Sequence, residues 1–118
     1  HNPVSVNRED AARLGLKNGD AVRLTTPGKS ILAVALVRDG MMPGAIAIEH
    51  GYGHTEMGAR EHLVDGKALP QNAAHANGVN LNHLGFADPS RAEHQNVWVD
   101  WVSGAVVRQG LPERIERA

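Results

Sequence analysis

The sequence predicts a mainly β protein, built as a small closed barrel with one short helix near its start. Three observations support this fold class: short apolar segments at strand spacing, tight turns at glycine, and only one helical pattern. Closure of the barrel also removes the exposed edges that short strands leave. The 118 residues, 42% of them hydrophobic, suffice for one core, so we predict a single domain over residues 1–118.

The beginning of the chain contains a strand followed by a helix with clear start and stop signals. Val4 and Val6 alternate with polar neighbours, which indicates a short strand. Asn7 is a suitable N-cap, and two acidic residues follow it in the first helical turn, where the helix dipole favours negative charge. Gly15 ends the helix. A helix this short must pack on a sheet to be stable.

Two longer strands follow. Val22 and Leu24 share one face of a strand at residues 21–26, after a turn in which we expect Asp20 to cap its own backbone. A reversal at Pro27-Gly28 leads to residues 30–38, which are apolar on both sides. That pattern predicts a strand buried on both faces.

The second half of the chain is different in character. A third short strand at residues 45–48 precedes a glycine-rich stretch from His50 to Arg91 without apolar periodicity. An irregular stretch of this length indicates a functional excursion rather than a simple connection. Beyond it we expect a strand at residues 97–102 that closes the sheet, with Trp98 and Trp101 on opposite sides, a weaker strand at 105–107 and a polar tail at 112–118.

Composition excludes several classes of function. Lys and Arg total 12 against 13 for Asp and Glu, so we expect no nucleic-acid partner. The absence of cysteine excludes disulfides, thiolate metal sites and a thiol nucleophile within this chain. No apolar run has the length of a membrane span, and we expect no membrane contact by this domain. The chain begins at His1 with ordered-looking sequence, so we expect a fragment of a larger subunit.

The run from Val6 to Leu24 resembles the opening of the molybdopterin dinucleotide-binding domain, the last domain of catalytic subunits in the dimethyl sulfoxide reductase superfamily. The resemblance continues in register through four further elements: Pro27-Gly28, Pro43-Gly44, His50-Gly51-Tyr52-Gly53-His54 and Asn80-Leu81-Asn82-His83-Leu84, followed by Asp88-Pro89. It implies a six-stranded double-psi β-barrel with one or two short helices, whose loops at one end hold the cofactor.

The same resemblance implies a function. The cofactor would be molybdopterin guanine dinucleotide, with molybdenum or tungsten held by the cofactor and not by this chain. The expected partners are an electron-transfer subunit and the remaining domains of the same catalytic subunit. The isolated domain is not expected to be catalytic. Residues 80–86 and the histidine-rich loop look similar to tetrathionate reductase and related sulfur-compound or oxyanion reductases. The periplasm and the cytoplasm both stay open, and we favour an exported parent enzyme.

The resemblance assigns the pterin contact to Asn82 first and Asn80 second, because a carboxamide both donates and accepts hydrogen bonds. The alternative is that both asparagines satisfy backbone groups of their own turn. Glycines at 51, 53 and 78 would let the backbone approach the cofactor closely. The other predicted cofactor-binding residues are His50, Gly51, Tyr52, Gly53, His54 and His83, with a solvent-exposed loop tip as the alternative. Arg60, Lys67 and Arg91 are weaker candidates for the pyrophosphate.

Two other kinds of function fit the sequence less well. His50 and His54 have the spacing of a helical zinc pair, but glycines intervene and the glutamate of a zinc hydrolase is missing. We therefore predict no metal ligand and no catalytic residue in this chain. A protein-interaction or substrate-adaptor module on the same barrel explains the first third of the sequence and leaves the asparagine-rich element without a role. A free-standing enzyme with a histidine site lacks a nucleophile at a suitable spacing.

Overall fold

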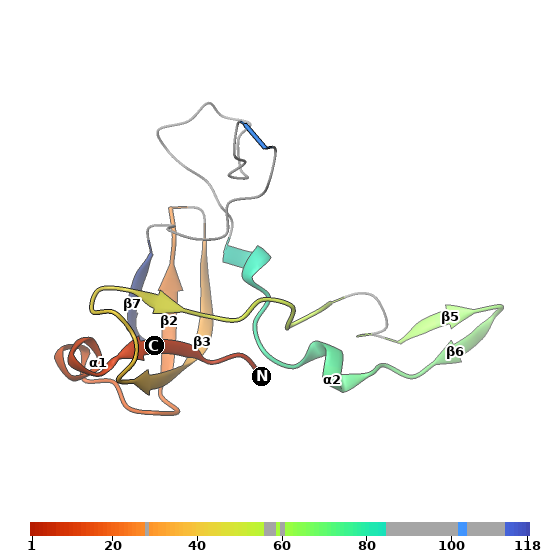
Figure 1. Ribbon diagram of the computed structural model, residues 1–118. Coiled ribbons are helices and arrows are strands. Elements are labelled where there is room, and N and C mark those ends of the chain that lie inside the picture. The colour runs from red at the N-terminus through yellow and green to blue at the C-terminus, as the bar shows by residue number, and fades with distance from the viewer. Residues whose placement is uncertain (28, 56–58, 60, 85–101, 104–112) are drawn as a thin grey trace.

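The computed structural model describes all residues except 28, 56–58, 60, 85–101 and 104–112 (Figure 1). The described part is mainly β, as predicted. Its elements are β1 (Val4–Asn7), α1 (Arg8–Leu14), β2 (Ala21–Thr25), β3 (Ser30–Arg38), β4 (Ile46–Ala47), β5 (His62–Val64), β6 (Lys67–Leu69), α2 (Ala73–Ala76), the 3-10 helix η1 (Leu81–Leu84) and β7 (Arg114–Arg117).

Five of the strands form one curled sheet in the order β4-β1-β3-β2-β7. The long strand β3 pairs with two neighbouring strands. Its residues 30–34 pair antiparallel with β2, and its residues 35–38 pair parallel with β1. Figure 1 shows β1 and β4 running across the direction of β2 and β7, so the sheet curls into a half-barrel. The two-stranded β5–β6 hairpin is separate from it.

A turn before β2 marks the place where β3 changes partner. The backbone N–H of Ala35 donates to the Asp20 carbonyl at 2.9 Å, and the Ala35 carbonyl accepts from Gly19 N–H at 3.0 Å. The Asp20 carboxylate in turn accepts from Lys17 N–H at 3.0 Å, which is the predicted capping role. The turn is therefore stabilised by its own hydrogen bond. Its backbone also pairs with Ala35, at the point where β3 passes from β2 to β1.

Helix α1 has the predicted caps. The Asn7 side chain accepts from Glu9 N–H, and Gly15 ends the helix with a left-handed φ of 67°. The buried Asp10 links the helix to the turn before β4, since its carboxylate accepts from Gly44 N–H at 2.6 Å and from Arg13 at 2.6 Å. The helix thus packs against β1 and β3 at one end of the curled sheet.

The core lies inside the curl. Val4, Val6, Val22 and Leu24 are fully buried, and Leu84 reaches them from η1. One prediction for β3 is wrong: Ile31, Ala33 and Ala35 are buried, but Leu32 on the opposite face is 57% exposed. In the described part of the chain, the curl encloses one face of β3, and on the opposite face Val34 and Leu36 are half-buried.

Two further predictions need correction. The stretch after His50 is not a single irregular loop, because it contains β5, β6, α2 and η1. The end of the chain is not a polar tail, since β7 pairs antiparallel with β2 at the edge of the sheet. The predicted strands at 97–102 and 105–107, with both tryptophans, lie outside the described residues except for Val102, which is in a turn and 96% exposed. Where helices are described, all are too short to cross a membrane.

Candidate functional site

The two segments assigned to the cofactor lie side by side. Gly53 N–H donates to the Asn77 carbonyl at 2.9 Å, and His54 N–H donates to the His75 carbonyl at 3.0 Å. These bonds join the glycine-rich segment 50–54 to the end of α2 and the residues that lead into η1. The structure therefore brings together two segments that are separated in sequence by the β5–β6 hairpin (Figure 1).

Glycine permits this close approach at two positions. A Cβ on Gly53 would lie 2.5 Å from Asn80 N and 2.8 Å from the Val79 carbonyl carbon, and its φ is 65°. A Cβ on Gly78 would overlap the Asn2 side chain and lie 3.0 Å from the Tyr52 Cβ. Both glycines therefore allow one chain segment to contact another, and the N–H of Gly53 is already bonded within the protein. Gly51 differs, because the space around it is open.

Asn2 fixes the two segments to the start of the sheet. Its side chain is 1% exposed and donates to the Glu49 carbonyl at 2.6 Å and to the Val79 carbonyl at 3.0 Å. Its side-chain oxygen accepts from Val79 N–H at 2.8 Å. One buried carboxamide thus bonds the residue before His50 and the residue before Asn80. Sequence reasoning missed this residue, since its partners lie 47 and 77 positions away.

The helix η1 is fixed at its other end. Leu84 is buried in the core, and its carbonyl accepts from the Thr26 hydroxyl at 2.9 Å. Val79 and Leu81 also pack against the core, each partly buried. Because the inward residues of η1 are three apart, Asn82 and His83 between them face outward and are exposed.

The two predicted pterin ligands have different hydrogen-bonding states. The Asn80 side-chain oxygen accepts from Asn82 N–H at 3.0 Å, so this half-buried residue caps its own turn. The Asn82 carboxamide is exposed, and it makes no hydrogen bond with the described part of the chain. Asn82 therefore keeps its full donor and acceptor capacity for a ligand, whereas Asn80 uses one lone pair to shape the turn.

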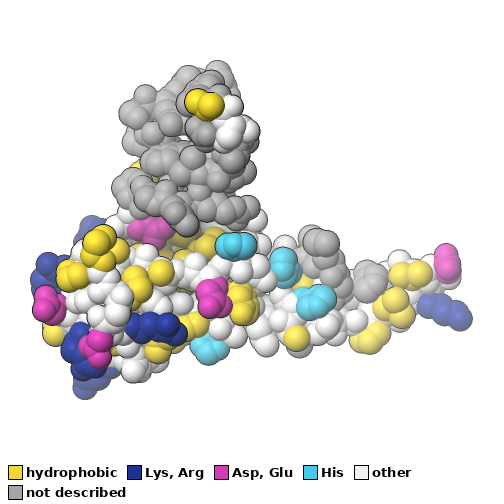
Figure 2. Space-filling view, viewed as in Figure 1, with side chains coloured by type: hydrophobic (Ala, Val, Ile, Leu, Met, Phe, Trp, Pro, Cys, Tyr) yellow, Lys and Arg dark blue, Asp and Glu magenta, His cyan; other side chains and the backbone are white. Residues whose placement is uncertain are grey.

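The other predicted residues of this site are on the same surface as these segments. His50, His54 and His83 are exposed, and Tyr52 is half-buried with its hydroxyl 3.4 Å from the Glu49 carboxylate. Figure 2 shows histidine side chains gathered over the middle of the molecule, between the sheet and the β5–β6 hairpin. Among the described residues, groups of three or more His, Asp and Glu placed to hold a metal ion are absent. The groups at this surface are the Asn82 carboxamide, the imidazoles of the exposed histidines, the Tyr52 hydroxyl and the backbone at Gly51.

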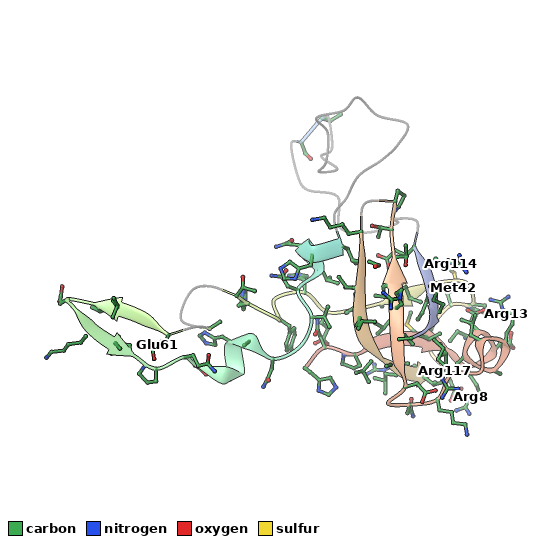
Figure 3. All side chains as sticks on the ribbon, turned by 180° about the vertical axis from the view of Figure 1, so that it is seen from behind. Arg8, Arg13, Met42, Glu61, Arg114 and Arg117 are labelled. Carbon is green, nitrogen blue, oxygen red and sulfur yellow. The ribbon has the colours of Figure 1, made fainter. Side chains whose placement is uncertain are left out.

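Four arginines of the described chain lie elsewhere. Figure 3 shows Arg8, Arg13, Arg114 and Arg117 near the α1 and β7 end of the sheet. Each has an acidic partner: Asp39 for Arg8, Asp10 for Arg13 at 2.6 Å, Glu116 for Arg114 at 3.1 Å and Asp20 for Arg117 at 3.8 Å. The Arg8 guanidinium lowers the pKa of the Asp39 carboxyl. Of the pyrophosphate candidates, Lys67 is on the hairpin, and Arg60 and Arg91 lie outside the described residues.

Comparison with known proteins identifies the family of the chain. Residues 1–97 match the family described as the Molydopterin dinucleotide binding domain. The chain is 55% identical over 116 residues to a subunit of tetrathionate reductase from Salmonella typhimurium, and the match covers 98% of this chain and 11% of that protein. It is 32% identical over 107 residues to the molybdopterin-containing subunit of the arsenate respiratory reductase of Chrysiogenes arsenatis, covering 91% of this chain and 11% of that protein.

A third relative is a subunit of selenate reductase from Mesobacillus selenatarsenatis, 31% identical over 96 residues, which cover 70% of this chain and 9% of that protein. The chain spans about a tenth of the length of these relatives. They support the cofactor-domain interpretation and not the adaptor module. The family match over residues 1–97, on a curled β fold that holds the two predicted segments together, establishes that the chain belongs to the molybdopterin dinucleotide-binding domain family.

Proposed function

We propose that this chain is the C-terminal domain of the catalytic subunit of a molybdenum or tungsten oxidoreductase. In this role it binds molybdopterin guanine dinucleotide and fixes its position. The observation that carries the proposal is the pairing of segments 50–54 and 77–83 at one surface, where the Asn82 carboxamide is exposed.

The residues present suit this cofactor. A pterin edge offers donors and acceptors in one plane, and the free carboxamide of Asn82 can match both. The exposed rings of His50, His54 and His83 can stack on a flat heterocycle or donate to phosphate oxygens. At Gly51 a Cβ would meet open space, so a ligand can approach the backbone there. When bound, the cofactor supplies the metal and the dithiolene sulfurs at which electrons are exchanged.

The contribution of this chain is binding and orientation. Asn82 holds the pterin by hydrogen bonds, and Asn80 keeps the turn in the shape that presents Asn82. Tyr52 and the histidines exclude water from one side of the ligand. In this way the protein tunes and positions the cofactor without itself providing a reacting group.

The complete fold is proposed to be the six-stranded double-psi barrel of the family. The parallel pairing of β1 with β3, between antiparallel neighbours, supports this topology. Closure would protect the sheet edges.

The substrate class follows from the relatives. Proteins similar to this chain are named for tetrathionate, arsenate and selenate, so we propose a sulfur-compound or oxyanion reductase. The chain would then be one domain, residues 1–118, of a much larger subunit that works with an electron-transfer subunit. We propose an exported parent enzyme.

Metal and pterin analysis of the full-length subunit tests the function. The wild type is expected to contain the metal and the dinucleotide, and Asn82→Ala to lose most of the bound cofactor while its unfolding transition stays unchanged. Gln71→Ala removes an exposed carboxamide before α2 and is the matched control, with normal occupancy expected. A full-length protein without pterin contradicts the proposed function, and an Asn82→Ala variant with normal occupancy removes Asn82 from the site.

A further inference from the structure

The β5–β6 hairpin is an apolar projection from the domain. Asp65 and Gly66 connect its strands with positive φ values of 48° and 75°, a geometry that suits a tight two-residue hairpin turn. Figure 1 shows the hairpin at the far end of the molecule from the sheet, beyond α2. Leu63 is 73% exposed, Val64 45% and Leu69 42%. The hairpin therefore presents large apolar side chains to its surroundings.

Both faces of the hairpin carry large apolar side chains. Leu63 pairs with Ala68, and paired residues of antiparallel strands point to the same face. Val64 pairs with Lys67, and its face is shared with Leu69, two positions beyond Lys67. A hairpin that lies on one flat surface needs apolar residues on one face only. Apolar residues on both faces fit a cleft between two surfaces.

The hairpin also needs a partner for its own stability. Each strand has only three residues, and a two-stranded hairpin of this length is marginal in water without packing against other elements. Exposed apolar groups of this kind typically indicate an interaction site. A partner that contacts both faces of the hairpin must be large enough to form a cleft around it.

We propose that the β5–β6 hairpin is an arm that inserts into the preceding domains of the same catalytic subunit. The inference rests on the proposed function, because it needs the larger subunit of which the chain would be a part. Similar proteins are about ten times longer than this chain, which leaves ample protein to form a cleft. The two segments proposed to face the cofactor flank the arm in sequence, so the arm enters the same interface that encloses the ligand.

The alternatives are a second copy of the chain and a separate electron-transfer subunit. Neither is favoured, because the arm emerges directly beside the proposed cofactor surface, and other domains of the same subunit must approach that surface to enclose the ligand. The tip carries one charge of each sign, on Asp65 and Lys67, so it offers no net charge to attract a distant partner.

Photo-crosslinking in the full-length subunit tests the arm. The photoreactive residue p-benzoylphenylalanine replaces Leu63 or Leu69 in separate variants, and Met42, 71% exposed near the α1 end, is the matched control position (Figure 3). We expect positions 63 and 69 to join peptides that precede His1 in the same polypeptide, with a yield several-fold above that of position 42.

Three results overturn the arm proposal: no crosslink from 63 and 69, a yield equal to that of position 42, or crosslinks mainly to a second copy or another subunit. Failure of the proposed function is a separate result. It would be seen as a gene without a preceding catalytic region, or as a full-length subunit without pterin. Missing crosslinks in a subunit that contains pterin contradict the arm proposal and leave the proposed function unaffected.

Discussion

The curled sheet and the segment from His50 to Leu84 are stabilised in different ways. In the sheet, apolar side chains such as Val6, Val22 and Leu24 are fully buried inside the curl. In the second region, the backbone segments contact each other directly at Gly53 and Gly78, through hydrogen bonds and close approach. Among the described residues of that region, Leu84 alone reaches the main core as a fully buried side chain.

The difference explains how exposed polar residues can be held in fixed positions. Asn2 and Thr26, both buried residues at the ends of sheet strands, bond the backbone of the second region through Val79 and Leu84. Because backbone atoms and glycines make many of the contacts there, the side chains of Asn82, His50, His54 and His83 remain exposed. The sheet supplies the core, and the second region carries the exposed side chains that we propose to bind the cofactor.

The largest expected effect is on the sheet. Leu24→Ala removes a fully buried side chain, and the cavity should lower the free energy of unfolding of the 118-residue chain by about 2–5 kcal/mol. Urea unfolding measures the change. The exposed Leu32→Ala is the control, expected to change stability by about 0.5 kcal/mol or less. Equal losses in the two variants would contradict the position of the core.

The second effect concerns the connection between the regions. Asn2→Ala leaves the N–H of Val79 and the carbonyls of Glu49 and Val79 without their buried partner, at a cost of about 1–3 kcal/mol. Amide hydrogen exchange should accelerate in peptides that cover 49–54 and 77–84 and stay slow in β2 and β3. Uniform acceleration across the chain would show that Asn2 supports the whole fold rather than this connection.

A pair of glycine variants separates backbone strain from steric overlap. Gly78 and Gly44 have similar φ values, 86° and 78°, but a Cβ meets Asn2 and Tyr52 at Gly78 and open space at Gly44. Gly44→Ala should cost about 1–2 kcal/mol from the left-handed backbone alone. Gly78→Ala should cost more, as measured by urea unfolding, and equal costs would argue against the close approach.

The smallest effect is a pH dependence from Glu113 before β7. One carboxylate oxygen of this half-buried residue is enclosed without a hydrogen bond from the described chain, and burial raises its pKa. A raised pKa in the folded state means that this group stabilises the fold below its unfolded pKa and loses that contribution as pH rises through the folded value. Glu113→Gln should therefore be more stable than the wild type near about pH 7 and nearly equal to it near about pH 4.

Thermal unfolding at the two pH values measures the difference. Glu61→Gln, which removes the same charge from an exposed side chain, is the control, and its stability should differ from that of the wild type by about 0.5 kcal/mol or less. A Glu113→Gln profile parallel to that of the wild type would contradict the burial of this carboxylate.

Local signals in the sequence are sufficient to predict most strands of the sheet. The Asn7 cap, the Gly15 stop and the alternation in β2 depend on neighbouring residues, and the structure confirms each. The β5–β6 hairpin also has a local signal, because Asp65-Gly66 lies between two short apolar runs. This signal is weak, because Gly66 is one of many glycines in the same stretch and the runs beside it are only three residues long. The sequence therefore predicts a fully irregular loop here, and that prediction is wrong.

Other features depend on contacts between distant residues. β7 has one apolar residue, Ile115, and it is a strand because it pairs with β2, far away in sequence. Asn2 has partners beyond the reach of any local pattern. The site residues around Asn82 came from a family resemblance, and the geometry of their segments could not be deduced from spacing alone.

The central claim is that segments 50–54 and 77–83 together form the cofactor-binding surface. Amide hydrogen exchange tests this most directly when the full-length subunit is purified both with the cofactor and from a host unable to synthesise it. We predict that the cofactor slows exchange in peptides covering both segments and leaves β2 and the first half of β3 unchanged. Protection of only one segment, or of neither, would contradict the claim.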